Sequence, residues 1–354
     1  MGWIFETNPE HQKKLDWADA FVREEVEPLA HLWGNDTFLP RDESRRKILD
    51  PRKAEVKRHG LWATHLGPEL GGQGYGQLEL ALLNEILGWT PWASQVFGCQ
   101  APDTGNAEII AHYGTEEQKE RYLQPLLDGE IFSGYSMSEP HAGADPTRFT
   151  CRAVKDRDEW VINGWKYFSS NAKVAAFLIV MAVTDPDVSR YQGMSMFLVP
   201  TDTAGVKTER NVGLYGEAMN DGSHALIHYD DVRVPADALL GGENRAFAVA
   251  QTRLGGDRIH HAMRTIGLAQ KALDMMCTAG PVPALRALHR MADAVLPDDP
   301  RRRRDGPRRQ PDRSAQRHRG QAGTARPPAQ RRSMAHGMDP PGGRGRPGQV
   351  RRPH

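Results

Sequence analysis

The 354-residue chain is poor in several features that would assign it to a particular class of protein. Its three cysteines, Cys99, Cys151 and Cys277, form neither a C-x-x-C pair nor an even framework, which argues against a disulfide scaffold and favours a reducing compartment. No run of 18 apolar residues occurs, and the N-terminus MGWIFETNPE lacks the apolar core of a signal peptide. We therefore expect a cytoplasmic protein of two or three domains.

The C-terminal segment from residue 281 onward lacks lysine, glutamate and aromatic side chains. It holds 18 arginines, 12 prolines and 6 aspartates, a net charge of +12, and this leaves −11 for residues 1–280. Such a composition cannot bury enough apolar surface to offset the entropy of ordering, so we predict a disordered basic tail over residues 280–354. The abrupt change after Cys277 also resembles translation of a GC-rich gene in the wrong frame, and one intact reading frame found by resequencing would contradict this.

Helical periodicity dominates the first third of the chain. Apolar residues predict helices over residues 8–33, where Pro28 shortens or kinks the helix, and over residues 51–59, 77–88 and 103–113. The run from Thr115 to Gln118 is a capping box that opens another helix. The glycine-rich loop at residues 67–76 fits neither common nucleotide-binding fingerprint, because no strand precedes it. We predict an all-helical N-terminal domain over residues 1–132.

The periodicity changes after residue 132. Short β-branched or apolar runs at residues 160–162, 177–183, 194–199 and 225–229 predict an antiparallel β domain over residues 133–242. From residue 243 the helical period returns, and it predicts one long helix over residues 247–276 that is interrupted or eased at Gly255 and Gly256. The fold class is therefore α+β.

The stretch YSMSEPHAGAD, residues 135–145, lies at the junction of the helical and β parts. Pro140 restrains Glu139 to an extended backbone, and Gly143 tolerates backbone angles that larger residues avoid. Ser138 and the N–H groups around it are donors that a planar heterocycle could use. The residues alone leave two interpretations open, a cofactor loop or an ordinary interdomain turn.

Three motifs, in this order, resemble the acyl-CoA dehydrogenase family over roughly residues 5–277. YSMSEPHAGAD resembles that family's flavin and substrate loop, and NGWKYFSSNA at residues 163–172 resembles its second flavin segment, G-x-K-x-W-I-T-N. GGDRIHHAMRTIGLA at residues 255–269 resembles the first helix of its C-terminal domain. The form RIHHAMRTIGLA is most similar to the subgroup that animals carry fused behind a phosphotransferase-like domain. The resemblance implies a C-terminal helical domain that is incomplete here, with only its first helix over residues 243–279.

The resemblance implies an FAD-dependent oxidoreductase that oxidises an acyl-CoA across its α and β carbons. A carboxylate takes the α-proton while a hydride leaves the β carbon for flavin N5. Ala144, where the family usually has serine, and Arg258 are implied to contact the acyl-CoA. The missing hydroxyl at Ala144 costs about 0.5–1.5 kcal/mol of binding. The residues implied to contact FAD are Tyr135, Met137, Ser138, Gly143, Ala144, Phe168, Ser169 and Ser170.

The catalytic base is implied less directly. In most members of the family it comes from later C-terminal helices, but in isovaleryl- and long-chain-type members it is a glutamate directly before the matched arginine. Asp257 holds that position here, and a carboxylate misplaced by about 1 Å can cost about a hundredfold in rate. The alternative is a helix-surface acid, or one paired with Arg253 or Arg258. No metal site is expected, because the adjacent His260 and His261 point to different helix faces.

The partners implied by the resemblance are acyl-CoA, an electron-transfer flavoprotein and further copies of the chain in a homodimer or homotetramer. With an incomplete helical bundle, we expect an exposed apolar face on residues 247–276 and a poorly folded or inactive polypeptide. Two alternatives stay open. One is a nucleic-acid-binding protein that uses the basic tail, although the tail lacks lysine and aromatic stacking residues. The other is an acyl-CoA oxidase or flavin monooxygenase of the same fold, which oxygen consumption would distinguish.

Overall fold

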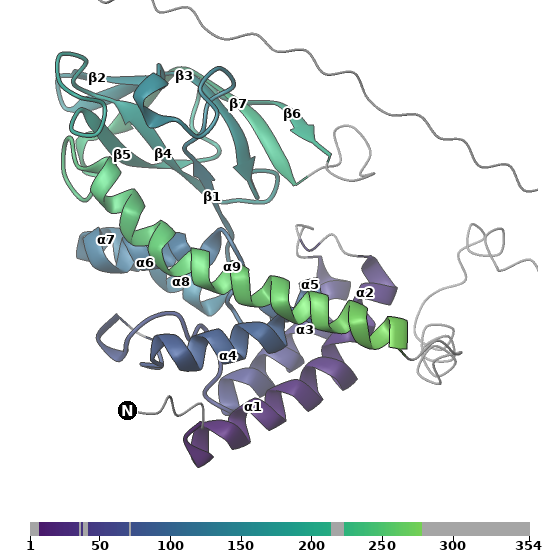
Figure 1. The fold of residues 1–354 in the computed structure, drawn as a ribbon. Helices are drawn as coiled ribbons and strands as arrows, with labels where there is room; N and C mark the ends of the chain where they lie inside the picture. The colour runs from purple at the N-terminus through teal and green to yellow at the C-terminus, as the bar shows by residue number, and fades with distance from the viewer. Residues whose placement is uncertain (1–6, 35–36, 38–41, 71, 214–222, 278–354) are drawn as a thin grey trace, which may run out of the picture. The chain divides into compact units, whose positions relative to one another are not determined.

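The structure is a computed structural model that describes residues 7–34, 37, 42–70, 72–213 and 223–277. Helices come first, a β-sheet follows, and one long helix ends the described chain (Figure 1). This order confirms the predicted α+β class. The basic tail predicted over residues 280–354 lies outside the described residues.

The helical part is built from short segments. The predicted helix over residues 8–33 forms as two α-helices joined by a π-helical segment that ends two residues before Pro28, which has no N–H to give to an α-helical bond. The capping box at Thr115 is confirmed, since Thr115 and Gln118 each accept the other's backbone N–H. The segments are α1 (Pro9–Phe21), a π-helix (Val22–Val26), α2 (Glu27–Trp33), α3 (Glu43–Arg58), a 3-10 turn (Pro68–Leu70), α4 (Gln77–Leu87), α5 (Pro91–Val96), α6 (Asp103–Tyr113), α7 (Glu116–Gln118), a second π-helix (Lys119–Leu123) and α8 (Gln124–Asp128).

The prediction that a helix begins near Pro51 was wrong. Helix α3 begins at Glu43, where the side chain of Asp42 accepts the N–H of Arg45, and Pro51 lies inside the helix. A capping aspartate is a stronger start signal than a proline that the helix can accommodate at its solvent side.

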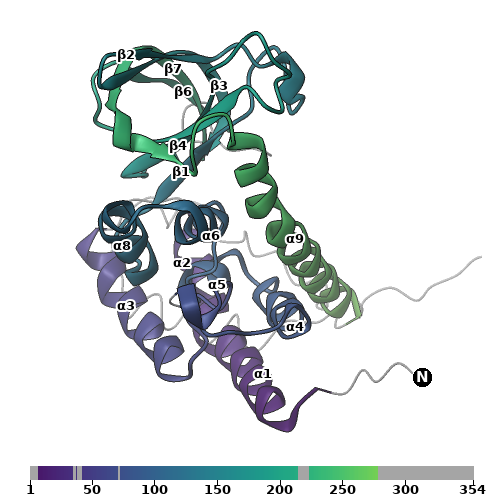
Figure 2. The same ribbon diagram turned by 90° about the vertical axis from the view of Figure 1, so that its left-hand side faces the viewer.

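The strands of the described residues form one curled sheet (Figure 2). The strand order is β6-β7-β3-β1-β4-β5-β8, and β2 pairs with both β3 and β4. Most neighbours are antiparallel, as predicted, but β4 runs parallel to β1 and to β2. The strands are β1 (Ser133–Ser136), β2 (Arg152–Asp156), β3 (Glu159–Ser170), β4 (Phe177–Val183), β5 (Met194–Pro200), β6 (Val206–Val212), β7 (His224–Pro235) and β8 (Leu239–Leu240), with 3-10 turns at Pro146–Arg148 and Ala236–Ala238.

Strand β4 is buried on both faces. Ile179 and Met181 belong to an apolar cluster that also contains residues of α6 and the start of α9 (Ala246–Cys277). Leu178 and Val180, which point the opposite way, belong to a second cluster inside the curl of the sheet. This double burial explains why the strand reads as a continuous apolar run and not as an alternating pattern.

Helix α9 is continuous, so of the two predicted effects of Gly255 and Gly256, an interrupted or an eased helix, the interruption was wrong. A glycine is needed instead at Gly267, where a Cβ would lie 1.9 Å from the carbonyl oxygen of Glu85. A Cβ on Gly88, just after α4, would lie 2.1 Å from the carbonyl oxygen of Arg264. The two glycines let the backbones of α4 and α9 touch.

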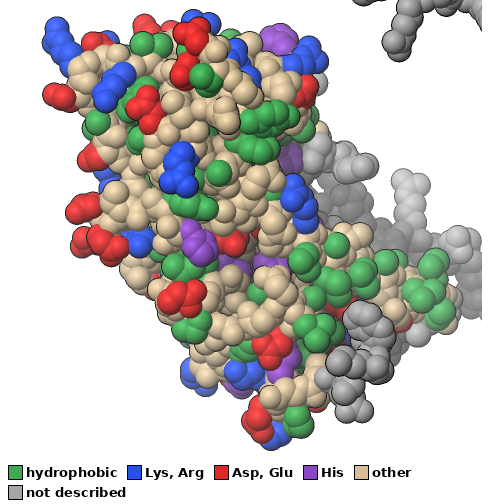
Figure 3. Space-filling view, turned by 60° about the vertical axis from the view of Figure 1, so that its left-hand side comes forward, with side chains coloured by type: hydrophobic (Ala, Val, Ile, Leu, Met, Phe, Trp, Pro, Cys, Tyr) green, Lys and Arg blue, Asp and Glu red, His purple; other side chains and the backbone are tan. Residues whose placement is uncertain are grey.

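The exposed apolar face predicted for this helix is confirmed. Figure 3 shows hydrophobic side chains gathered on one face of the molecule. The large apolar side chains of α9 that are 42–71% exposed are Ile259, Ile266, Leu268, Leu273, Met275 and Met276. None of the helices in the described ranges is long and apolar enough to cross a membrane.

Candidate functional site

The loop over residues 135–145 leaves β1 and folds back on itself. Glu139 and Gly143 form an isolated β-bridge, with the N–H of Gly143 donating to the carbonyl oxygen of Glu139 at 2.8 Å. Gly143 has a φ of +58°, which explains the glycine at this position. Asp145 then accepts the N–H of Thr147 and starts a 3-10 turn. The loop is thus a tight, internally bonded turn whose tip exposes Gly143 and Ala144.

Beneath the loop lies a buried ion pair. Lys166 Nζ of β3 lies 2.9 Å from Glu139 Oε1, and the two residues are 0% and 2% exposed. Burial raises the pKa of Glu139, but the charge of Lys166 and the N–H groups of Thr150 and Cys151 outweigh burial, so the net pKa lies below its ordinary value. The carboxylate is therefore ionised at neutral pH.

The end of β3 departs from regular strand geometry where the sequence predicted flavin contacts. The register with β7 shifts between Tyr167 and Ser169, and Phe168 at the shift has a φ of +61°. A non-glycine residue in the left-handed region of backbone angles is uncommon, and the strain costs about 1–3 kcal/mol of stability. Such strained residues cluster at functional sites. The bulge leaves the Phe168 ring 49% exposed.

The two segments predicted to contact flavin lie side by side. Tyr135 of β1 pairs with Ser170 of β3 in the antiparallel register. The hydroxyl of Ser170 bonds to His224 Nδ1 at 2.8 Å. Ser169, in contrast, is buried, and its hydroxyl bonds to that of Ser136 at 2.7 Å. The Ser169 side chain is therefore used inside the sheet.

Helix α9 reaches the same place through Arg253. Its guanidinium lies over the ring of Tyr135, 3.9 Å from the centroid, and is only 8% exposed. Arg253 Nε donates to Asn106 Oδ1 of α6 at 3.0 Å, and Asn106 donates to Ser133 Oγ at 2.9 Å. Asn171, near the end of the second predicted flavin segment, donates to the Ser133 carbonyl oxygen at 3.0 Å. One polar chain therefore links α9, α6, β1 and the end of β3.

Asp257 lies against α6 and not toward the solvent. Its Oδ2 is 3.5 Å from Arg253 NH1, and Thr104 Oγ1 donates to its Oδ1 at 3.5 Å. The pairing with Arg253, which was one of the alternatives for this residue, is thus observed. Arg258 lies on the exposed side of the helix and apart from this pair.

A second carboxylate stands beside Asp257. The pKa of Glu108 on α6 is raised to about 7, first by burial and second by the charge of Asp257, against an opposing effect of Arg253. Sequence reasoning missed Glu108, Asn106 and the contact of Arg253 with α6, because Asn106 and Arg253 are 147 residues apart in the sequence. The only local signal was an arginine one helical turn before Asp257.

Burial also governs the neighbouring histidines. The pKa of His260 is lowered to about 4, first by burial and second by the charge of Arg264. The side chain is therefore neutral at physiological pH. In the part of the chain that the structure describes, no group of three or more His, Cys, Asp or Glu side chains is placed to hold a metal ion.

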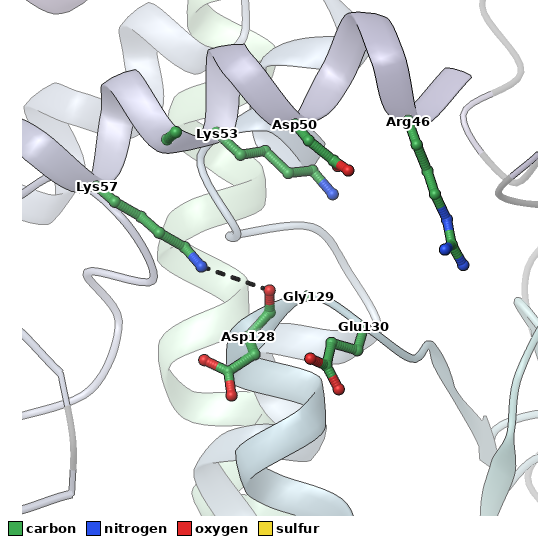
Figure 4. A pocket seen from close by; sticks show the side chains of 8 residues that line it. Arg46, Asp50, Lys53, Lys57, Asp128, Gly129 and Glu130 are labelled. Atoms are coloured by element: carbon green, nitrogen blue, oxygen red, sulfur yellow. Dashed lines mark hydrogen bonds between the residues drawn. The ribbon is translucent and has the colours of Figure 1, made fainter. Parts of the chain in front are cut away.

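Two cavities differ in their relation to this site. One of about 500 Å³ lies between α3 and the C-terminal end of α8, where Lys57 Nζ is 3.5 Å from the carbonyl oxygen of Asp128 (Figure 4). None of the residues predicted to bind flavin lines it. A second, of about 310 Å³, adjoins the loop and is lined by Pro140, His141, Trp165, Tyr167, Arg210 and Leu226.

Comparison with protein families gives two consecutive matches. Residues 8–130 match the acyl-CoA dehydrogenase N-terminal domain, and residues 134–232 match the acyl-CoA dehydrogenase middle domain. A protein of Gallus gallus named acyl-CoA dehydrogenase family member 11 is 39% identical over 288 residues. That alignment covers 78% of this chain and 36% of the chicken protein, so the chain spans about a third of the length of this relative.

Two solved structures share the fold. A protein from Mycobacterium abscessus, described as a putative acyl-CoA dehydrogenase, has a TM-score of 0.70 at 39% identity, covering 77% of this chain and 70% of that one. A glutaryl-CoA dehydrogenase from Mycobacterium smegmatis in complex with FADH2 has a TM-score of 0.62 at 22% identity, covering 82% of this chain and 73% of that one.

Proposed function

Because the chain belongs to the acyl-CoA dehydrogenase family, we propose that it supplies two walls of an FAD site for α,β-dehydrogenation of an acyl-CoA thioester. The observation that carries the proposal is the pairing of Tyr135 with Ser170, which brings together two segments that are far apart in the sequence. Both segments resemble the flavin-binding segments of the family, and a relative of the same fold was solved with FADH2.

The residues present suit a flavin. Phe168 offers an exposed aromatic side chain at a backbone conformation that a regular strand would not adopt, and Ser138 and Ser170 are partly exposed hydroxyl residues on the two segments. Phe168 and Ser170 belong to β3, and a buried ion pair underlies the loop that carries Ser138. A planar ring with polar edges needs such a mixture of apolar face and hydrogen-bond donors.

The bound flavin would supply hydride acceptance, and the chain's own residues would do the rest. Met137 and Ser138 would contact the ring through the loop backbone, and Gly143 and Ala144 would lie where flavin and acyl-CoA meet. Arg258, on the exposed side of α9, would contact the acyl-CoA. Tyr135 stays neutral in this role, because burial raises its pKa to about 12.

We propose Asp257 as the group that takes the α-proton, and its ion pair with Arg253 is a competing structural role. The oxygens of Asp257 are oriented toward Arg253 and Thr104, whereas a general base must reach the proton that it takes. An electron-transfer flavoprotein as acceptor and a homodimer or homotetramer complete the proposal. We further propose that this polypeptide is poorly folded or inactive as it stands, given the exposed apolar face of α9.

The test is the absorbance spectrum of the purified full chain, titrated with FAD and then with acyl-CoAs of different lengths without oxygen. We expect the flavin absorbance to shift on binding. Bleaching by an acyl-CoA would support dehydrogenation and contradict the proposed inactivity. A spectrum identical to that of free FAD at every protein concentration would overturn the flavin site itself.

A further inference from the structure

We propose that Glu139 and Lys166 are positioning residues of the flavin site, which hold its two segments in one register. Neither side chain reaches the surface, so neither touches the ligand directly. The proposal rests on the proposed function, since it concerns how the two segments of the FAD site are held in position before FAD binds.

The first support is the set of bonds made by Lys166. Its ammonium group donates to Glu139 Oε1 at 2.9 Å and to the carbonyl oxygen of Met137 at 2.8 Å, and it lies 4.5 Å from the centroid of the Phe149 ring. Withdrawing a lysine fully from water is unfavourable unless its donors are satisfied. Through the bond to Met137, the charged group of Lys166 binds the backbone of the flavin loop directly.

The second support is the set of bonds made by Glu139. One carboxylate oxygen accepts the N–H and the hydroxyl of Thr150, at 2.7 and 3.0 Å, and the other accepts the N–H of Cys151 at 3.0 Å. With Lys166, four donors therefore converge on one carboxylate. This carboxylate therefore bonds the loop both to the residues directly before β2 and to β3.

The third support is the place of Lys166 in β3. The next residue, Tyr167, donates its N–H to the carbonyl oxygen of Ser138 at 2.9 Å, and the bulge at Phe168 follows immediately. A slip of one residue would turn every side chain of the strand to the opposite face. A lysine that can meet Glu139 only in one register excludes that slip and keeps the Phe168 ring outside.

The experiment compares Lys166→Met, the double variant Glu139→Gln with Lys166→Met, and the control Lys207→Met. The control removes a lysine from an ion pair with Asp230 on the same sheet, with side chains that are 53% and 49% exposed. Each full chain is titrated with FAD by fluorescence quenching, its visible circular dichroism is recorded with FAD bound, and its melting temperature is measured without FAD.

We expect Lys166→Met to weaken FAD binding about tenfold or more and the control to leave it unchanged. The double variant removes both charges, so its melting temperature recovers toward that of the unaltered chain. If its FAD affinity and its circular dichroism recover as well, the pair has only a structural role and the proposal is overturned. Failure of the unaltered chain to bind FAD would instead overturn the proposed function.

Hydrogen exchange of the unaltered chain gives a readout that does not depend on any variant. Thr150 and Cys151 do not belong to the predicted flavin contacts, yet their N–H groups bond to Glu139. We expect FAD to slow exchange at these two amides together with that of Tyr167. Protection confined to residues 135–145 and 168–170 would contradict the coupling through the ion pair.

Discussion

The charges of Arg253 and Asp257 lie almost entirely out of water, between α6 and α9. A buried charge is tolerable only with partners, and removing one partner leaves the other uncompensated. Arg253 keeps its bond to Asn106 and its contact with Tyr135 if Asp257 is lost, which limits the damage.

We expect Asp257→Asn to lower the free energy of unfolding by about 3 kcal/mol, because Arg253 would lose its counter-charge. Urea denaturation measures this. The control Glu116→Gln breaks an exposed pair with Lys119 and should cost less than about 0.5 kcal/mol. Should the unaltered chain reduce flavin with an acyl-CoA after all, unchanged reduction by the variant would eliminate Asp257 as the base.

Glu108 predicts a dependence of stability on pH. Its pKa in the folded chain, about 7, lies above the ordinary value of 4.5, so the folded state binds more protons than the unfolded state between these values. Stability is then lost as the pH rises through this window. We expect Glu108→Gln to be more stable than the unaltered chain at pH 8, by about 1 kcal/mol after solvent screening, and to gain nothing at pH 4. Equal thermal shifts at both pH values would contradict this.

At the scale of the element, the close contact between α4 and α9 requires residues without a Cβ atom, namely Gly88 and Gly267. The backbone of α9 at Gly267 touches the carbonyl of Glu85, while Gly255 on the same helix has open space around it. Gly267 and Gly255 are therefore a matched pair of positions for the same substitution.

We expect Gly267→Ala to destabilise the chain by about 1–3 kcal/mol, because the added methyl group would push the two helices apart. Gly255→Ala should stabilise it by about 0.5–1 kcal/mol through helix propensity alone. Thermal unfolding of both variants tests the pair. A similar shift in the same direction for both would mean that the close helix contact is absent.

The features that the sequence could predict are those that depend on residues close together in the chain. The capping box at Thr115 and the loop over residues 135–145 depend on neighbours in the chain, and local patterns revealed both. The insertion of β1 between β3 and β4, and the contact of Arg253 with Tyr135, depend on residues that are distant in sequence. No local periodicity encodes such contacts, and a four-residue strand is too short to show one.

The bulge at Phe168 was predictable only in part. Resemblance placed Phe168 in a flavin segment, but its φ of +61° and the inward turn of Ser169 follow from the bonding of Ser169 to Ser136. The residue types of the segment were therefore predictable, while the side chains that remain available to a ligand were not.

At the scale of the whole molecule, the exposed apolar side chains of α9 favour association. Leu273 and Met276 are 49% and 71% exposed near the end of the described helix. We expect the double substitution Leu273→Glu with Met276→Glu to reduce self-association, as measured by light scattering across a range of concentrations.

The control adds the same charge without removing large apolar groups. Ala269 and Ala272 are also exposed on α9, so Ala269→Glu with Ala272→Glu isolates the effect of charge. An equal reduction by both double variants would show that charge alone, and not the apolar face, governs association.

Strand β4 has a consequence for any attempt to dissect the chain. One of its faces packs into the apolar cluster inside the curl of the sheet, and the other packs against α6 and the start of α9. A fragment cut at residues 133 and 242 would keep all its strands yet lose the cover over Ile179 and Met181. Protein engineers who wish to graft this sheet elsewhere would have to redesign that face as a surface, or carry the two helices with it.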